Sequence, residues 1–166
     1  MLETERLVLR DISNEDAEDI VRIWSDPRVN KYLQDPLYSN VEVIKGMIPV
    51  INSSLNYAFV IIQKDTETII GTCGIGPQVS LEDEWEFGYC LGPEAWGNGY
   101  ATEILCALIR LAQKNGIKAV VGEVAIDNLQ SVKVMEKNGL QFYKDSVFTK
   151  ADGSATFKSK IYRRIL

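Results

Sequence analysis

A strand that runs through a glycine-containing loop into a long helix is the feature that most constrains how this chain folds. Residues Trp85–Leu91 have the composition of a strand, and Ala101–Lys114 carries its apolar residues on one helical face. The loop between them contains Gly97 and Gly99, which let a backbone approach a ligand without a Cβ in the way. A strand and a helix joined in this way predict an α/β protein.

Further strands and helices are predicted on both sides of this unit. Strands are expected at residues 7–11, 57–63, 68–75, 119–126, 140–149 and 156–165, and helices at residues 17–24, 40–53 and 128–138. Ser13 and Asp16 form a capping-box pattern before the first helix, and Pro49 interrupts the second. We expect one domain, residues 1–166, whose mixed, mostly antiparallel sheet has about six to seven strands flanked by helices.

The charge of the chain argues against a general attraction to nucleic acid or anionic lipid. The 166 residues include 18 Lys and Arg against 23 Asp and Glu, a net charge of −5. Residues 137–166 carry a net charge of +5, but their basic residues alternate with Phe, Ile and Tyr as on the solvated face of a strand. An RNA-associated protein that uses this basic C-terminal hairpin is one alternative function.

The absence of histidine from the sequence excludes several kinds of site. Without histidine there is no Ser-His or Cys-His nucleophile pair and no histidine-ligated metal, so no metal is expected. Cys73, Cys90 and Cys106 form no C-x-x-C pair and are interpreted as core residues in a reducing compartment. No apolar run approaches the roughly 18 residues that a membrane span needs, so a cytoplasmic protein is expected.

The loop from Gly97 to Ala101 suits a phosphate or pyrophosphate. Free backbone N–H groups and the positive end of the helix dipole meet at the start of a helix. No Lys-Ser or Lys-Thr follows these glycines, so the loop is not a P-loop. The other glycine cluster, Gly71-x-x-Gly74-x-Gly76, lies in a predicted strand and opens no helix, so its glycines are interpreted as bulge or packing positions.

Five segments, in this order, resemble the GNAT superfamily of acetyl-CoA-dependent N-acetyltransferases, and more narrowly its RimJ/RimL-like branch, which acetylates ribosomal proteins. They are Thr4–Arg10, Trp24–Val29, Pro93–Glu103, Asn128–Ser131 and Glu136–Leu140. The resemblance covers nearly the whole chain and is strongest over Pro93–Glu103. It implies an N-acetyltransferase with acetyl-CoA as cosubstrate.

The resemblance also implies which residues bind the cofactor. The pyrophosphate lies on the amides of the glycine loop, and the two amides of the pantetheine arm pair with the backbone of the preceding strand, Glu86–Leu91. The family's glutamine or arginine at the first loop position is Trp96 here, which backbone contacts tolerate. The implied cofactor-binding residues are Tyr89, Cys90, Leu91, Trp96, Gly97, Asn98, Gly99, Tyr100, Ala101, Thr102, Asn128, Ser131 and Lys137.

Acetyl transfer to an amine needs a base, because an amine like that of lysine titrates near 10.4 and attacks only when neutral. The resemblance places Glu86 beside the thioester, and Glu86 acting through water is the expected catalytic base, with Glu84 as second choice. An ordinary solvent-facing carboxylate is the alternative for Glu86. A backbone N–H near Cys90 or Leu91 is expected to polarise the thioester carbonyl.

Met135 lies where many members of the family have a tyrosine that acts as general acid. This departure leaves Ser131, one turn nearer the helix start, as the expected catalytic donor to the thiolate, with Tyr143 as a substitute. Ser131 is equally typical of a hydroxyl in a first helical turn. A thiol titrates near 8.5, so the thiolate can also leave without much help. Because Met135 replaces the usual tyrosine, a non-catalytic acyl-CoA-binding module is the second alternative function.

The resemblance places the acceptor beside Tyr32, Leu33, Tyr38 and the acidic loop Glu82-Asp83-Glu84. Tyr32, Leu33 and Glu84 are the expected substrate-binding residues, and an acidic rim favours a cationic amine. The expected acceptor is a primary amine, either a protein N-terminus or a small cationic amine. Direct transfer is expected, since no cysteine has a histidine to activate it. The expected partners are coenzyme A and this amine, with no membrane or nucleic acid, and a homodimer is left open.

Overall fold

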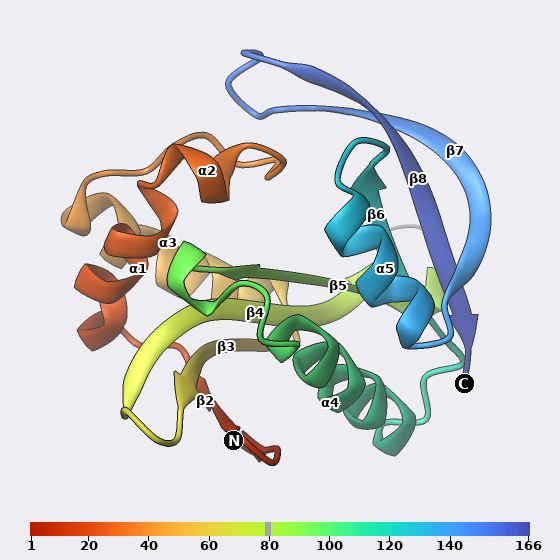
Figure 1. Ribbon diagram of the computed structural model, residues 1–166, viewed down its shortest axis with the longest axis horizontal. Coiled ribbons are helices and arrows are strands. Elements are labelled where there is room, and N and C mark those ends of the chain that lie inside the picture. The colour runs from red at the N-terminus through yellow and green to blue at the C-terminus, as the bar shows by residue number, and fades with distance from the viewer. Residues whose placement is uncertain (79–80) are drawn as a thin grey trace.

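One eight-stranded sheet forms the centre of the molecule (Figure 1). The computed structural model describes residues 1–78 and 81–166, without the side chains of residues 78, 81 and 82. The strands are β1 (Leu2–Glu3), β2 (Leu7–Asp11), β3 (Tyr57–Gln63), β4 (Thr68–Gln78), β5 (Leu81–Leu91), β6 (Ala119–Ala125), β7 (Gln141–Thr149) and β8 (Thr156–Ile165). Their order is β1-β2-β3-β4-β5-β6-β8-β7, and neighbours are antiparallel except β5 and β6. The mixed α/β fold is confirmed, and the short β1 adds a strand to the predicted number.

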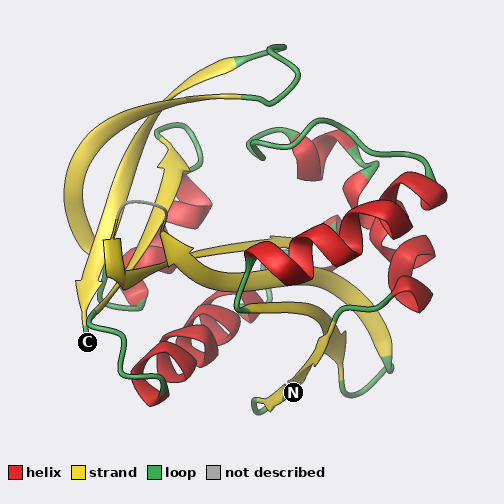
Figure 2. Ribbon diagram, turned by 180° about the vertical axis from the view of Figure 1, so that it is seen from behind, coloured by secondary structure: helices red, strands yellow, loops and turns green. Residues whose placement is uncertain are grey.

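Helices cover both faces of the sheet (Figure 2). On one face lie α1 (Ala17–Trp24), α2 (Pro27–Asn30) and α3 (Val41–Ser54), and on the other α4 (Tyr100–Lys114) and α5 (Leu129–Lys137). Ala58 and Val60 of β3 pack toward α1 and α3, whereas Phe59 and Ile61 join the core that contains α4. This alternation is expected of a strand that is buried on both faces. In the described part of the chain, no helix has the length and apolar character that a bilayer crossing requires.

Three local predictions change in the structure. The capping box at Ser13 and Asp16 opens a short 3-10 helix, Asn14–Asp16, that leads into α1. The helix α3 continues through Pro49 without a break. The acidic segment that was expected to be a loop belongs to β5, which begins at Leu81 rather than at residue 85.

The glycines of β4 are packing positions, as the sequence predicted. A Cβ on Gly71 would lie 2.2 Å from the carbonyl oxygen of Cys90, and one on Gly74 would lie 2.7 Å from Leu55. The register between β3 and β4 also shifts beside Gly71, where β4 has an extra residue. These glycines therefore let neighbouring segments approach the sheet closely.

The sheet opens between β5 and β6. The two strands pair at three positions, from Glu84 with Ala119 to Glu86 with Val121, and in the described residues the pairing ends there. Beyond it, the ring of Phe87 packs against Gly122, where a Cβ would lie 2.5 Å from the ring. The edge of β5 from Phe87 to Leu91 that faces β6 is therefore available to a ligand, except for the carbonyl of Leu91, which accepts from the indole N–H of Trp96.

Candidate active site

A cavity of about 520 Å³ lies at the opening between β5 and β6. On one side it is lined by α1, α3 and the segment that follows α2, and on the other by β6 and the start of α5. Side chains on β5 reach both sides, because successive residues of a strand point to opposite faces. Cys90 packs with Ile23 and Val29 near α1 and α2, whereas Tyr89 packs with the core that contains α4. The cavity thus joins the two faces of the sheet.

Glu86 lines this cavity from β5, on the same face as Cys90. The residue is exposed toward the cavity, and partial desolvation by the cavity wall, together with the charge of Glu123, raises the pKa of Glu86. Glu123 accepts a hydrogen bond from the hydroxyl of Ser159 at 2.5 Å. Both glutamates also line a smaller cavity of about 200 Å³. Glu86 is therefore placed where a base would act.

On the opposite side of the opening, two hydroxyl groups meet. Tyr89 of β5 donates a hydrogen bond to the Oγ of Ser131 in α5, over 3.3 Å. Burial raises the pKa of Tyr89, so its hydroxyl keeps its proton at neutral pH. Asn128 caps α5 by accepting from the backbone N–H of Ser131 at 3.3 Å. Met135 is buried in the same wall and has no proton to give, whereas Tyr89 and Ser131 both bring a hydroxyl group to it.

The glycine loop has the backbone conformation that a helix N-terminal binding site needs. Gly97 and Gly99 have φ values of +78° and +79°, and Gly99 is the N-cap of α4. The first N–H groups of α4, from Tyr100 to Thr102, have no acceptor within the helix. The indole N–H of Trp96 donates to the carbonyl of Leu91 at 2.8 Å, which ties the loop to β5. This loop does not line the 520 Å³ cavity and lies beside it.

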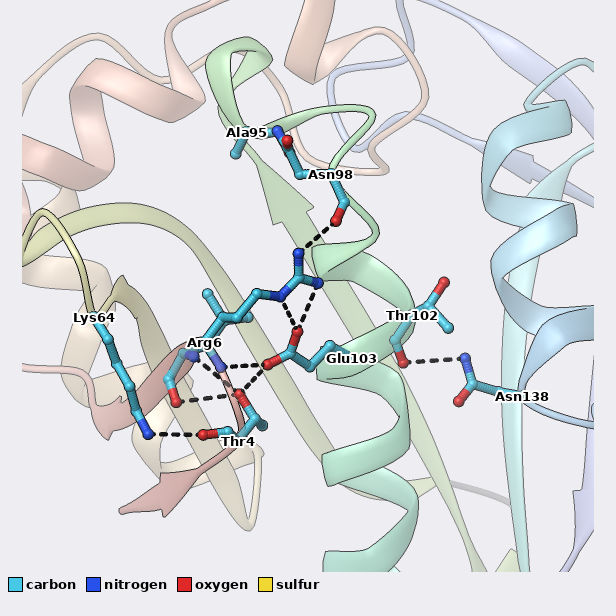
Figure 3. A network of polar contacts seen from close by, with 9 residues as sticks. Thr4, Arg6, Lys64, Ala95, Asn98, Thr102, Glu103 and Asn138 are labelled. Atoms are coloured by element: carbon cyan, nitrogen blue, oxygen red, sulfur yellow. Dashed lines mark hydrogen bonds and ion pairs between the residues drawn. The ribbon is translucent and has the colours of Figure 1, made fainter.

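Arg6 holds the loop against the start of α4 (Figure 3). Its guanidinium donates to the carbonyl of Asn98 at 2.9 Å and to the carboxylate of Glu103 at 2.8 Å. The Cζ of Arg6 also lies over the ring of Tyr100, 4.5 Å from the ring centroid. Glu103 also accepts from the hydroxyl of Thr4. Asn98 and Tyr100 were predicted to bind the cofactor, whereas Thr4, Arg6 and Glu103 lie in the family-like segments but had no predicted role. The sequence signal for these contacts was the Thr-Glu-Arg segment at residues 4–6, but its partner Glu103 lies 97 residues after Arg6.

The end of α5 contacts the start of α4. The side-chain amide of Asn138 donates to the carbonyl of Thr102 at 3.3 Å (Figure 3). Lys137 precedes Asn138 and is exposed. The structure therefore places Lys137 near the first turn of α4.

Two residues predicted to move protons, Glu84 and Tyr143, lie away from the cavity. Glu84, expected as second base and as a substrate contact, is buried in an ion pair with Arg163 of β8, which satisfies its carboxylate. Tyr143, the substitute donor, is exposed on β7 beside the same arginine. Neither residue lines the cavity in the described part of the chain.

The acidic rim is not formed as expected. Asp83 forms a surface ion pair with Lys118, at 2.5 Å, and Glu84 forms the ion pair with Arg163. The side chain of Glu82 lies outside the described residues. Other carboxyl groups line the cavity instead, namely Asp35 and Glu123 besides Glu86. No sequence pattern marked Asp35 or Glu123, because each reaches the cavity from a segment far from β5.

The remaining acceptor-side predictions do come together. Tyr32, Leu33 and Tyr38 all line the cavity, and Tyr38 packs on Trp24 with 6.1 Å between ring centroids. Burial raises the pKa of Asp35 beside them. This part of the cavity combines aromatic surface with a carboxyl group.

Cys90 is a buried thiol rather than a thiolate. Burial raises its pKa, and its sulfur lies 3.2 Å from the hydroxyl oxygen of Thr72. The indole N–H of Trp24 donates to the same hydroxyl at 3.2 Å. A protonated thiol is a weak nucleophile, which favours transfer without an acetyl-cysteine.

The chain matches known acetyltransferases in sequence and in fold. Residues 6–141 match the family described as the acetyltransferase (GNAT) domain. Over 160 residues the chain is 36% identical to the uncharacterized N-acetyltransferase p20 of Bacillus licheniformis, a match that covers 92% of this chain and 89% of that protein.

Two solved structures share the fold. One is the spermidine N-acetyltransferase from Vibrio cholerae in complex with CoA and spermine, with a TM-score of 0.83, 17% identity, and coverage of 98% of this chain and 96% of the other. The other is the ribosomal-protein-S5-alanine acetyltransferase from Vibrio fischeri, with a TM-score of 0.78, 20% identity, and coverage of 99% and 95%. At these identities the likeness concerns the fold alone.

Proposed function

This chain belongs to the acetyltransferase (GNAT) family, and we propose that it transfers the acetyl group of acetyl-CoA directly to a primary amine. The observation that carries the proposal is the opening between β5 and β6. It has Glu86 on one side and the Tyr89–Ser131 hydroxyl pair on the other, within one cavity. A base and a proton donor thus lie on opposite sides of the place where the reacting groups would meet.

Two backbone features suit the cofactor. The N–H groups at the start of α4 would hold the pyrophosphate, and Arg6, which is paired with Glu103, would hold the glycine loop in place through the carbonyl of Asn98. The unpaired edge of β5 beyond Glu86 would pair with the amides of the pantetheine arm. When bound, acetyl-CoA supplies the activated acetyl group.

Glu86 is the group that accepts the proton of the amine. A cationic amine must lose a proton before it attacks, and a carboxylate whose pKa is raised is a stronger base than an ordinary one. Glu86 lies in the cavity wall, so a water molecule can pass the proton to it. A backbone N–H of β5 near Cys90 or Leu91 would stabilise the charge on the carbonyl oxygen.

Ser131 is the donor to the departing sulfur. The hydroxyl of Tyr89 points its proton at the Oγ of Ser131, which leaves the proton of Ser131 free to face the sulfur. Because Met135 is buried and cannot donate, this pair does the work that a tyrosine at that position would do. Its presence supports an enzyme over a non-catalytic acyl-CoA-binding module.

The chemistry of the cavity favours a cationic amine as acceptor. Asp35, Glu86 and Glu123 contribute carboxyl groups, and Trp24 and Tyr32 contribute aromatic faces. Structures with the same fold include a spermidine N-acetyltransferase and a ribosomal-protein-S5-alanine acetyltransferase, so polyamines and protein N-termini are the two acceptor classes to test for this chain. The second class would fit the RimJ/RimL-like branch.

The basic C-terminal hairpin gives less support to the RNA-associated alternative. Lys150 is buried, Arg163 pairs with Glu84, and Arg164 donates to the carbonyl of Asn138 at 2.6 Å. These cations are bound to the protein itself. Fewer of them are available to phosphates than the net charge of the segment suggests.

The test is an acetyl-CoA turnover assay against spermidine, free amino acids and peptides that begin with alanine or serine. We expect release of free coenzyme A that depends on an amine, with intersecting initial-rate lines. Intact-mass measurement after incubation with acetyl-CoA alone should show no acetylated protein. Release without any amine dependence would refute N-acetylation, and parallel lines with acetylated Cys90 would refute direct transfer.

A further inference from the structure

The acceptor-side wall of the cavity is built from a segment without regular secondary structure. Between α2 and α3, residues 31–40 form only turns, bends and irregular backbone. Six of them line the cavity, namely Tyr32, Leu33, Gln34, Asp35, Pro36 and Tyr38. A segment of this kind holds its shape through contacts made elsewhere.

Lys150 supplies such contacts from the tip of the β7–β8 hairpin, 120 residues away from Asn30 in the sequence. Its ammonium donates to the carbonyl of Asn30 at 2.7 Å, to the Oδ1 of Asn30 at 3.0 Å and to the carbonyl of Leu33 at 2.8 Å. An ammonium has three protons, and each has an acceptor here. The residue is 8% exposed, so water does not replace these partners easily.

Two neighbouring contacts join the same parts of the chain. The backbone N–H of Ala151 donates to the carbonyl of Gln34 at 2.8 Å. The ring of Phe157 in β8 meets the ring of Tyr32 edge to face, with 5.8 Å between centroids. In Figure 1 the β7–β8 hairpin arches over the sheet toward the end of the molecule that carries α2. The hairpin tip and the acceptor wall therefore form one unit.

We propose that Lys150 is a positioning residue for the acceptor: its buried ammonium fixes the segment from Asn30 to Asp35, and through it the shape of the acceptor side of the cavity. The inference rests on the proposed amine acetylation. Lys150 itself is not among the described residues that line the cavity, so it acts through the segment and not on the substrate. Burial lowers the pKa of Lys150 because desolvation disfavours the ammonium, and the carboxyl groups of Asp152 and Asp35 oppose this shift.

A substitution of Lys150 should therefore change binding of the acceptor but not binding of acetyl-CoA. Lys150→Met keeps most of the apolar stem but removes all three donors, so the carbonyls of Asn30 and Leu33 lose their partner. The wall that carries Tyr32 and Asp35 then samples other conformations. Among the described residues, the side chain of Lys150 hydrogen-bonds to Asn30, Leu33 and Asp35 and not to the glycine loop or β5, so acetyl-CoA binding should be unaffected.

The experiment measures KM for acetyl-CoA and for the acceptor, using spermidine or whichever amine of the turnover panel has the highest kcat/KM. For Lys150→Met we expect KM for the acceptor to rise about tenfold or more, with KM for acetyl-CoA changed by less than about twofold. Hydrogen exchange should become faster in residues 30–36 and stay unchanged in α4. Lys158→Met is the matched control, because Lys158 is exposed on the same hairpin and should leave all three quantities unchanged.

The outcomes separate the two proposals. If the wild-type protein acetylates no amine, the proposed function fails, and hydrogen exchange still reports whether Lys150 fixes the segment. If the wild-type protein is active and Lys150→Met leaves the acceptor KM unchanged, or raises both KM values equally, the positioning role is refuted.

A milder variant covers the case in which Lys150→Met does not fold. Phe157→Leu removes the edge-to-face contact with Tyr32 while keeping an apolar side chain. It should raise the acceptor KM about two- to fivefold without changing that of acetyl-CoA. An unchanged acceptor KM in Phe157→Leu would also count against the proposal.

Discussion

The cofactor side and the acceptor side of this site are built in different ways. On the proposed cofactor side, β5, the glycine loop and the start of α4 follow one another within residues 81–114, and the groups proposed to bind the cofactor are backbone N–H and C=O groups. On the acceptor side, the cavity wall combines α1, the segment after α2, α3 and β6, and its polar groups are side chains. One side depends on local backbone geometry and the other on long-range packing.

This difference has consequences for substitution. A backbone site tolerates many side chains but requires special φ values, as at Gly97 and Gly99. A side-chain site tolerates backbone variation but depends on individual groups such as Glu86 and on what holds them in place. Variants on the cofactor side should therefore affect binding of coenzyme A, and variants on the acceptor side should affect turnover and acceptor KM.

The largest effect is expected at Glu86. Glu86→Gln should lower turnover at neutral pH by a factor on the order of 10² to 10⁴, because it removes the base, while coenzyme A affinity measured by calorimetry stays nearly unchanged. In the wild-type protein, activity should fall with decreasing pH through the raised pKa of Glu86, above the usual range of a glutamate, as the carboxylate becomes protonated. That dependence should be absent from the variant. An unchanged rate would mean that solvent, and not Glu86, accepts the proton of the amine.

The next effect concerns the glycine loop. Gly99→Glu should abolish the rise in melting temperature that coenzyme A produces, since a side chain at φ +79° strains the backbone and its charge repels the pyrophosphate. Gly116→Glu is the control, because Gly116 has a φ of +73° at the other end of α4 and no atom within 4 Å of its Cβ position. If both variants keep coenzyme A binding, the loop is not the pyrophosphate site.

A smaller loss is expected where the two sides meet. Tyr89→Phe and Ser131→Ala should each lower kcat about tenfold, because the departing thiolate then lacks a proton donor but can still leave. Tyr143→Phe should leave kcat unchanged, since Tyr143 is exposed on β7. Steady-state kinetics at saturating acceptor measures all three. A full rate in Ser131→Ala together with a loss in Tyr143→Phe would reverse the assignment.

The smallest effect on chemistry is expected at Glu84, two residues before Glu86 on the same strand. Glu84→Gln should leave kcat of the folded protein intact but weaken the pair with Arg163, with a loss of about 1 kcal/mol in unfolding free energy. Chemical denaturation and turnover assays separate these results. A large drop in kcat without loss of stability would make Glu84 part of the acceptor site after all.

The sequence by itself determined the α/β fold, the order of the main strands and helices, and the glycine loop before α4. These depend on residues that are neighbours in the chain, through hydrophobic periodicity, caps and φ preferences. The predicted strand began too late, at residue 85, which shows the limit of this reasoning. The acidic residues before it resemble a loop in the sequence, and they belong to β5, where Glu84 pairs with Ala119 of β6.

Only the tertiary structure decided what each polar side chain does. Glu84 and Glu86 have the same residue type and the same strand, yet Arg163 of β8 neutralises the first and the opening between β5 and β6 exposes the second. Lys150 and Asn30 likewise meet only because the hairpin folds back over the sheet. The energy of a polar group depends on its partners and on burial, and both come from segments distant in the sequence.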